Sequence, residues 1–166
     1  MRVTVVGSGD AFGSGGRFNT CLHVAGGDAP LLLDCGASSL VALNAPHAAH
    51  LDRNAIGALL FTHFHGDHFG GLPFFILDAQ LASGRETPLI VAGPKGVEAR
   101  ALALMEMLFP GSATASRRFD LRFVEISPGA PVDLLGLRVE AFPMVHDERA
   151  GPCQGYRLSE GGKTFA

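Results

Sequence analysis

The sequence predicts an α/β fold, a sandwich in which helices cover the faces of β-sheets. Short apolar or β-branched runs of strand length alternate with turns rich in Gly, Pro, Ser and Asp. Two longer segments, 72–81 and 94–108, repeat their apolar residues at the helical period. Strands and helices are mixed along the chain, which favours a layered α/β arrangement. The 166 residues, 47% of them hydrophobic, are enough for one core, so we expect a single domain over 1–166.

The first third of the chain reads as three short strands followed by a short helix. The expected strands are 3–6, 21–24 and 31–33, and the expected helix is 38–43, with Ser38 at its start. The turn 7–16 between the first two strands holds five glycines. No Gly-Lys-Ser/Thr follows them, so the pattern does not predict a phosphate-binding loop for nucleotides.

The middle of the chain contains a buried strand and two helices. The apolar run 56–61 predicts the strand. The helix 72–81 has Pro73 in its first turn, where the missing N–H costs nothing, and one apolar face. A strand at 89–92 precedes the helix 94–108, which Pro110-Gly111 ends. Three further strands are expected at 119–126, 132–134 and 137–142.

The charge balance argues against a general nucleic-acid binder. The formal net charge is −3, and the one basic cluster (Arg117, Arg118, Arg122) fits a solvated surface, with a local role against a phosphate-bearing substrate as the alternative. The N-terminal residues do not predict an export signal, and no apolar run approaches membrane-spanning length. The three cysteines fit neither a zinc knuckle nor a dithiol motif, so we expect reduced thiols in a cytoplasmic protein.

The segment 61–71, Phe-Thr-His-Phe-His-Gly-Asp-His-Phe-Gly-Gly, is the most informative part of the chain. His63, His65, Asp67 and His68 are metal-capable side chains that directly follow the buried strand. His63 and His65 project the same way in an extended segment, whereas the adjacent Asp67 and His68 diverge and can serve a different metal. The spacing therefore favours two neighbouring metals over one closed structural site, which would more often use cysteines. The alternative is a solvated loop that happens to be rich in histidine.

This motif, with Gly70-Gly71-Leu72 after it, resembles the metal motif of the metallo-β-lactamase superfamily. Four further segments resemble the ribonuclease Z-like branch of that superfamily: 5–12, 31–36, 91–96, and Val145-His146 followed by Gly155-Tyr156-Arg157. The resemblance implies the αβ/βα sandwich of the superfamily. It also implies a metal-dependent hydrolase that uses a metal-bound hydroxide at a dinuclear site. Relatives of this kind are commonly homodimers.

The resemblance also assigns roles to individual residues. His63, His65 and His146 would bind one divalent metal, and Asp67 and His68 would form part of a second site. Zinc is the expected metal, with manganese or iron as alternatives. Asp67 would also orient or deprotonate the attacking water.

Asp34 is a candidate to hold a ligand imidazole by accepting its N–H. The alternative is a turn aspartate that caps the amides of Gly36 and Ala37. The resemblance also places Cys35 close to the metals. His23, His47 and His50 have no comparable context and are left unassigned, with His47 and His50 expected in an exposed turn.

The chain departs from the family pattern in two places. The bridging aspartate of a Gly-Asp-Thr-like segment and a later histidine are absent, and the sequence stops within what reads as a strand at 163–166. We expect a C-terminally truncated chain with weak or absent binding of a second metal; the alternative is a defective second site. A tight turn at 158–162 replaces the long arm with which ribonuclease Z grips transfer RNA, which argues against transfer RNA as substrate.

These observations favour a phosphodiesterase that acts on a small-molecule or nucleotide-type phosphodiester. Two alternatives stay open. The same metal site could hydrolyse another ester, such as a lactone, a thioester or a sulfate. The chain could also be a non-catalytic metal-binding or scaffold protein that keeps the fold.

Overall fold

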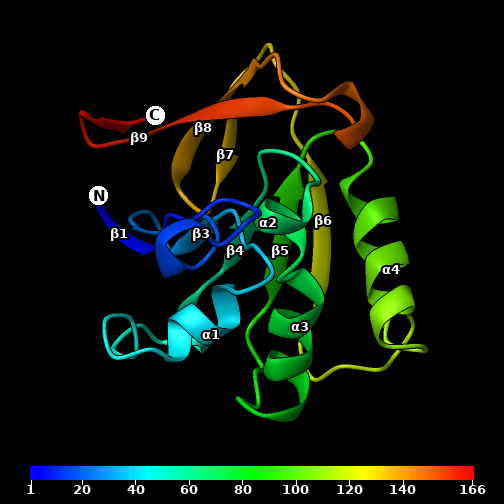
Figure 1. The fold of residues 1–166 in the computed structure, drawn as a ribbon. Helices are drawn as coiled ribbons and strands as arrows, with labels where there is room; N and C mark the ends of the chain where they lie inside the picture. Colours follow the sequence, from blue (N-terminus) through cyan, green and yellow to red (C-terminus); the bar gives the residue numbers. More distant parts are fainter.

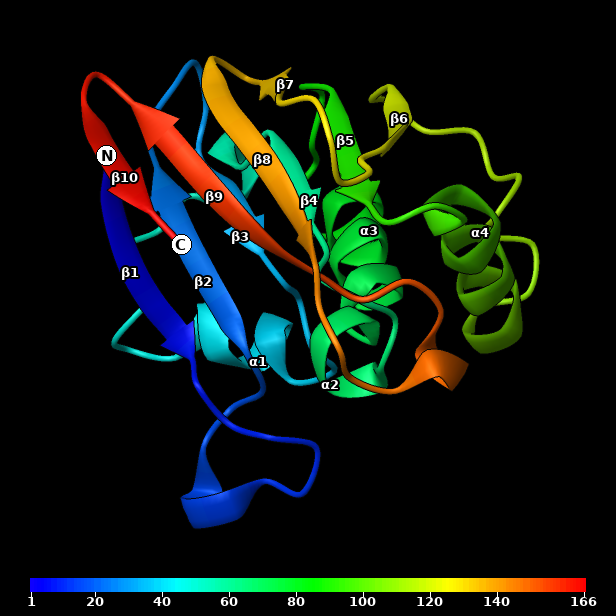
Figure 2. The ribbon, with the colours of Figure 1, turned by 90° about the horizontal axis from the view of Figure 1, so that it is seen from above.

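The structure, a computed structural model, describes the backbone of residues 1–166 and every side chain except that of Glu148. It confirms the α/β class. The strands form two sheets, one of six strands in the order β1-β2-β3-β4-β5-β6 and one of four strands in the order β10-β9-β8-β7. Figures 1 and 2 show the two sheets facing each other, with the helices packed on the outer side of the larger sheet.

The elements follow one another along the chain with short connections. The strands of the larger sheet are β1 Arg2–Gly7, β2 Cys21–Ala25, β3 Leu31–Leu33, β4 Ala58–Leu60, β5 Leu89–Gly93 and β6 Leu121–Glu125. The strands of the smaller sheet are β7 Val132–Leu134, β8 Leu137–Pro143, β9 Gln154–Glu160 and β10 Lys163–Phe165. The helices are α1 Ser39–Asn44, α2 Gly66–Phe69, α3 Leu72–Leu81 and α4 Val97–Leu108, and three single 3-10 turns lie at Ser14–Gly16, Arg53–Ala55 and Glu148–Ala150.

Strand β4 lies in the middle of the larger sheet and is buried on both faces. It pairs in parallel with β3 on one side and with β5 on the other. Its side chains alternate between two cores: Leu59 packs with the helices, whereas Ala58 and Leu60 pack between the sheets. This explains why the strand reads as a continuous apolar run. Since β3 and β4 are parallel, the residues that follow them emerge at the same edge of the sheet.

Some predicted boundaries shift for local reasons. The helix expected from residue 94 begins at Val97, because Gly96 precedes it in a left-handed conformation (φ 90°). The turn expected at 158–162 is shorter, since β9 continues to Glu160 and only Gly161 and Gly162 turn the chain into β10. Both glycines have positive φ, as a two-residue hairpin turn requires. Among the described residues, no helix is long and apolar enough to cross a membrane.

Candidate metal centre

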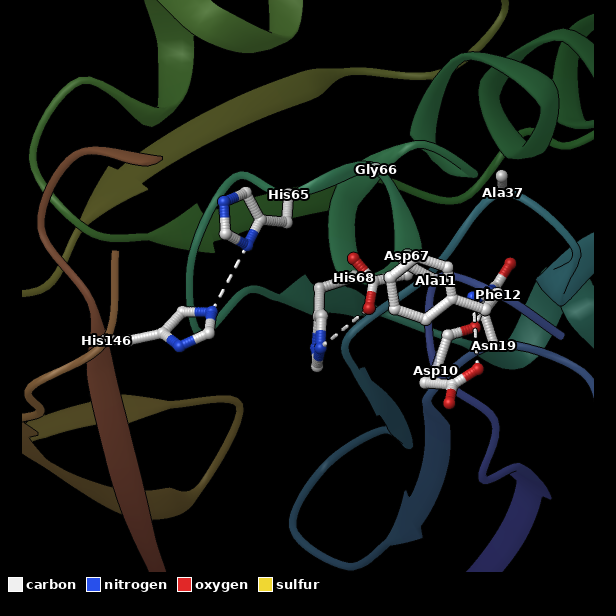
Figure 3. A pocket seen from close by; sticks show the side chains of 10 residues that line it. All are labelled: Asp10, Ala11, Phe12, Asn19, Ala37, His65, Gly66, Asp67, His68 and His146. Carbon is white, nitrogen blue, oxygen red and sulfur yellow. Dashed lines mark hydrogen bonds and ion pairs between the residues drawn. The ribbon is translucent and has the colours of Figure 1, made fainter. Parts of the chain in front are cut away.

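Three histidines from two distant segments of the chain converge beyond the end of β4 in the larger sheet. One ring nitrogen from each of His63, His65 and His146 lies within 4.8 Å of the others. His65 Nδ1 and His146 Nε2 are 3.2 Å apart, and a dashed line joins these two nitrogens in Figure 3. Tetrahedral zinc with nitrogen ligands at about 2.0–2.1 Å implies nitrogen pairs separated by roughly 3.3 Å. The His65–His146 pair has this separation, and the cluster as a whole could hold a metal ion.

The orientation of His63 supports this interpretation. The side chain lies three residues after the end of β4 and is buried, and its Nδ1 lies 2.9 Å from Thr62 Oγ1. Its Nε2 is buried and has no hydrogen-bond partner among the described residues. Burial, assisted by the neighbouring His68, lowers the pKa of His63 to about 4, so the ring is neutral at pH 7. A neutral imidazole whose Nε2 keeps a free lone pair is suited to bind a metal ion.

Asp34 holds the rings of two candidate ligands. Its carboxylate accepts a hydrogen bond from His68 Nδ1 at 2.7 Å and from Thr62 Oγ1 at 2.9 Å. Because the Thr62 hydroxyl proton is donated to Asp34, its oxygen is free to accept from His63 Nδ1. One buried carboxylate thus holds His68 directly and His63 through Thr62, leaving the Nε2 atom of each ring available.

The alternative role for Asp34, capping the turn that follows it, is wrong. The amide of Gly36 donates to Thr20 O, and the amide of Ala37 donates to Gly66 O. Asp34 itself adopts a left-handed backbone conformation, with φ 59°, although it is not glycine. Such a conformation costs energy and persists where surrounding contacts impose it.

Asp67 and His68 lie beside the three-histidine cluster. Both belong to the short helix α2, which the sequence did not predict, and Asp67 Oδ2 is 3.5 Å from His68 Nε2. The expectation that adjacent residues diverge assumed an extended segment and is wrong, because the helical turn brings the two side chains together. Burial lowers the pKa of His68, but the hydrogen bond that His68 donates to Asp34 and the charges of Asp34 and Asp67 outweigh burial and raise the pKa.

Close backbone packing places α2 against the segment after β3. Cys35 N donates to His68 O at 2.7 Å, and Gly71 N donates to Cys35 O at 2.8 Å. A Cβ atom on Gly36 would lie 2.0 Å from Asp67 O, so only glycine fits there. The Cys35 thiol is fully buried, and burial raises its pKa well above the usual range. Cys35 therefore contacts the motif through its backbone, and its thiol stays protonated.

The smaller sheet is fastened to the start of the motif by β9. Gln154 N donates to Thr62 O at 3.0 Å, and Tyr156 Oη donates to Phe61 O at 2.8 Å. Both side chains are buried, and Gln154 Nε2 donates to Ile126 O. These bonds hold the loop after β8, which carries His146, close to the residues that follow β4.

A cavity of about 680 Å³ opens in front of these side chains. Its lining residues, shown in Figure 3, are Asp10, Ala11, Phe12, Asn19, Ala37, His65, Gly66, Asp67, His68 and His146. Phe12 is 91% exposed on the loop after β1, which projects from the body of the molecule in Figure 2. The Asp10 carboxylate accepts from Phe12 N and from Ser14 N and Oγ, so this loop has a defined shape.

Two polar residues at the centre were not predicted. Thr62 links Asp34 to His63, and Asp147 Oδ2 lies 3.6 Å from His65 Nε2. Thr62 precedes His63 and Asp147 follows His146, so adjacency to a predicted ligand was the one sequence feature that could have indicated them. The Arg149 side chain, which donates to Asp147, lowers the pKa of Asp147 to about 2. His23 is buried in β2, and His47 and His50 lie in an exposed turn after α1, as expected.

The family described as Anti-Pycsar protein Apyc1 matches residues 1–165 of the chain. The chain belongs to this family. The chain is 37% identical over 92 residues to Anti-Pycsar protein Apyc1 of Paenibacillus sp. (strain J14), which covers 55% of the chain and 36% of that protein. It is 29% identical over 160 residues to ribonuclease Z of Lachnospira eligens, which covers 96% of the chain and 48% of the relative.

Solved structures share the fold of this chain. Human tRNase Z, short form, superimposes with a TM-score of 0.77 at 25% identity, covering 99% of the chain and 67% of that protein. The metallo-β-lactamase fold protein YhfI of Bacillus subtilis has a TM-score of 0.73 at 19% identity, covering 98% of the chain and 58% of YhfI, and supports the fold. The predicted membership of the metallo-β-lactamase superfamily, in its ribonuclease Z-like branch, is confirmed. The chain spans about half the length of the curated relatives it matches.

Proposed function

We propose that the protein is a metal-dependent hydrolase that acts on a phosphodiester. The observation that carries this proposal is the convergence of His63, His65 and His146 at a cavity also lined by Asp67 and His68. A divalent metal bound there, for which zinc is our first candidate, supplies Lewis acidity toward a phosphoryl oxygen and activates water near neutral pH. Asp67 and His68 are two donors for a second metal, which we expect to bind more weakly than the first.

The side chains of the protein would divide the work around the reacting phosphate. His63, His65 and His146 would bind the first metal through His63 Nε2, His65 Nδ1 and His146 Nε2. Asp67 lines the cavity and would orient the attacking water and accept its proton. Asp34 would keep His63 and His68 in the tautomers that leave Nε2 unprotonated.

We further propose a small nucleotide-type phosphodiester as the substrate. The exposed ring of Phe12 provides a flat apolar surface at the cavity, on which a base can stack. The two-residue turn at Gly161 and Gly162 leaves no arm at this point of the chain for gripping transfer RNA. The net charge of −3 also disfavours a large polyanion.

A substrate panel tests this proposal. Protein loaded with zinc or manganese is offered bis(p-nitrophenyl) phosphate, a 2′,3′-cyclic nucleotide, a precursor transfer RNA, a lactone and an aryl sulfate. We expect turnover of the first two substrates, and a loss of about 10²-fold or more in an Asp67→Asn variant. Turnover of the lactone or the sulfate alone would favour a hydrolase of another ester. If the metal-loaded protein turns over none of the substrates, a non-catalytic scaffold would be favoured.

We also propose a cytoplasmic location. Its support is that Cys21, Cys35 and Cys153 are all unpaired thiols, which fits a reducing compartment. A homodimer, which is common among relatives of this kind, is a further prediction that sedimentation of the protein would check.

A further inference from the structure

We propose that Asp147 is a positioning residue for His65, whose ring it holds so that Nδ1 faces the metal, and that Arg149 keeps Asp147 in place. This inference rests on the metal centre proposed above. It adds two residues of the loop after β8 to the machinery of the site, neither of which is itself a ligand.

The pattern around the other motif histidines motivates the inference. His63 has its Nδ1 against Thr62 Oγ1, and His68 has its Nδ1 against Asp34, so in each ring one nitrogen is held by an oxygen. The other nitrogen of each ring is left for a metal. An oxygen on the far nitrogen fixes both the tautomer and the orientation of a ligand imidazole. His65 needs an equivalent partner, and neither Asp34 nor Thr62 fills this role.

Asp147 stands where that partner is needed. His65 would bind the metal through Nδ1, whereas His63 and His68 leave Nε2 for a metal. We assign Nδ1 to His65 because this atom lies 3.2 Å from His146 Nε2. The remaining nitrogen, Nε2, lies 3.6 Å from Asp147 Oδ2. This separation is longer than a hydrogen bond, so the carboxylate acts on the neutral ring through its charge. A carboxylate there favours a proton on Nε2 and so leaves the lone pair on Nδ1.

Arg149 gives the carboxylate a defined position. Arg149 Nε donates to Asp147 Oδ1 and Nη2 donates to Oδ2, both at 2.9 Å, and the Arg149 amide donates to Oδ1 at 3.0 Å. Such a bidentate pair fixes orientation as well as position. The Arg149 side chain is 90% exposed and contributes nothing to the core, so the pair serves to orient Asp147.

The sequence position of Asp147 gives the arrangement a further consequence. Asp147 directly follows His146, so one short loop supplies a metal ligand and also the partner of a second ligand, His65. Placing this loop against the larger sheet therefore completes the three-histidine site and orients it in the same step.

Zinc affinity, measured by competition with a chromophoric chelator, tests the inference. We expect Asp147→Ala to weaken binding at the first site by about 10- to 100-fold, the effect typical of losing such a partner. Arg149→Gln should weaken it by a smaller factor, because the carboxylate remains but is less ordered. In the metal-free proteins, imidazole nitrogen chemical shifts should also show a mixture of His65 tautomers in Asp147→Ala. They should show one tautomer in the unchanged protein.

The chain offers a matched control. Asp120 and Arg122 form another exposed ion pair with the same spacing, in which Arg122 Nε donates to Asp120 Oδ2 at 2.6 Å, and neither residue lines the cavity. Asp120→Ala should leave zinc affinity unchanged. The metal-free Asp147→Ala and Asp120→Ala proteins should have similar melting temperatures, since both pairs lie at the surface.

The outcomes separate this inference from the proposed function. If the unchanged protein binds zinc and both Asp147→Ala and Arg149→Gln bind it equally well, the inference is overturned while the proposed function stands. If the unchanged protein does not bind zinc, the metal centre itself is wrong and the inference falls with it. If Asp147→Ala does not fold, Arg149→Gln alone tests the inference: weaker zinc binding supports it, and unchanged zinc binding overturns it.

Discussion

Asp34 is the residue that holds the rings of two candidate ligands, His63 and His68. It accepts from His68 directly and reaches His63 through the Thr62 hydroxyl. The sequence predicted Asp34 as a partner of a ligand imidazole but not this double role. The link through Thr62 exists because β3 and β4 are neighbours and end side by side, which the sequence did not reveal. Asp147 was missed for a related reason, since its partner His65 lies far away in sequence.

A pair of substitutions separates the two roles of Asp34. We expect Asp34→Ala to weaken metal binding at both positions by about 10- to 100-fold each, because it removes the oxygen that holds His68 and the anchor of Thr62. Thr62→Val should weaken only the position that uses His63. Zinc titration followed by chelator competition measures both effects, and an equal loss in the two variants would contradict the network described for Asp34.

The buried ring of His63 predicts a pH dependence for the metal-free protein. Its pKa is lowered from 6.5 to about 4 in the folded state, chiefly by burial. Between these values the unfolded chain binds more protons than the folded chain, so the free energy of unfolding should fall as the pH drops from 6.5 toward 4. His68 opposes this trend, because its raised pKa contributes stability at low pH that is lost as the pH rises.

The contribution of His63 is isolated with a neutral variant. Urea unfolding of chelator-treated protein at pH 7.5 and at pH 5 should show a smaller loss of stability for His63→Gln than for the unchanged chain. An equal loss in the two proteins would mean that another group causes the acid sensitivity.

At the scale of elements, the close approach of the segment after β3 to α2 determines where the motif lies. The sequence predicted β3, β4 and α3 correctly, since each has a clear apolar period or turn signal. It missed α2 because four residues are too few to show a helical period. The contact between Gly36 and Asp67 was also invisible in the sequence, because it joins two separate loops.

Two glycines near the motif should respond differently to alanine. Gly36→Ala would drive a methyl group into Asp67 O, so we expect loss of zinc binding and destabilisation by about 2 kcal/mol or more. Gly66→Ala meets no atom within 4 Å and has no positive φ, so stability and zinc affinity should change little, although Gly66 lies inside the motif. Metal content and thermal unfolding of the two variants check this contrast, and equal behaviour would contradict it.

The junction between β9 and the end of β4 makes a separate prediction. Tyr156→Phe removes the hydroxyl that donates to Phe61 O and leaves that buried carbonyl without this donor. We expect a loss of about 1–2 kcal/mol in the free energy of unfolding. Tyr156→Leu, which also removes the ring, should cost more, and urea unfolding of both variants provides the comparison. No change in Tyr156→Phe would show that the junction does not depend on this bond.

At the scale of the whole molecule, the candidate metal centre draws its residues from loops that follow both sheets. His63 and His65 follow a strand of the six-stranded sheet, whereas His146 follows a strand of the four-stranded sheet. The sequence alone indicated the four-residue motif, because its members are neighbours. His146 is 81 residues from His65, so spacing could not select it. The family resemblance selected it, together with the apolar residues Met144 and Val145 that precede it.

The central claim is that His63, His65 and His146 bind a divalent metal. Elemental analysis of the 166-residue protein after dialysis against zinc and then against buffer tests it most directly. We predict one tightly bound zinc per chain, and loss of that metal in His63→Ala while His23→Ala keeps it. Zinc content unchanged in His63→Ala, or absent from the unchanged protein, would contradict the account.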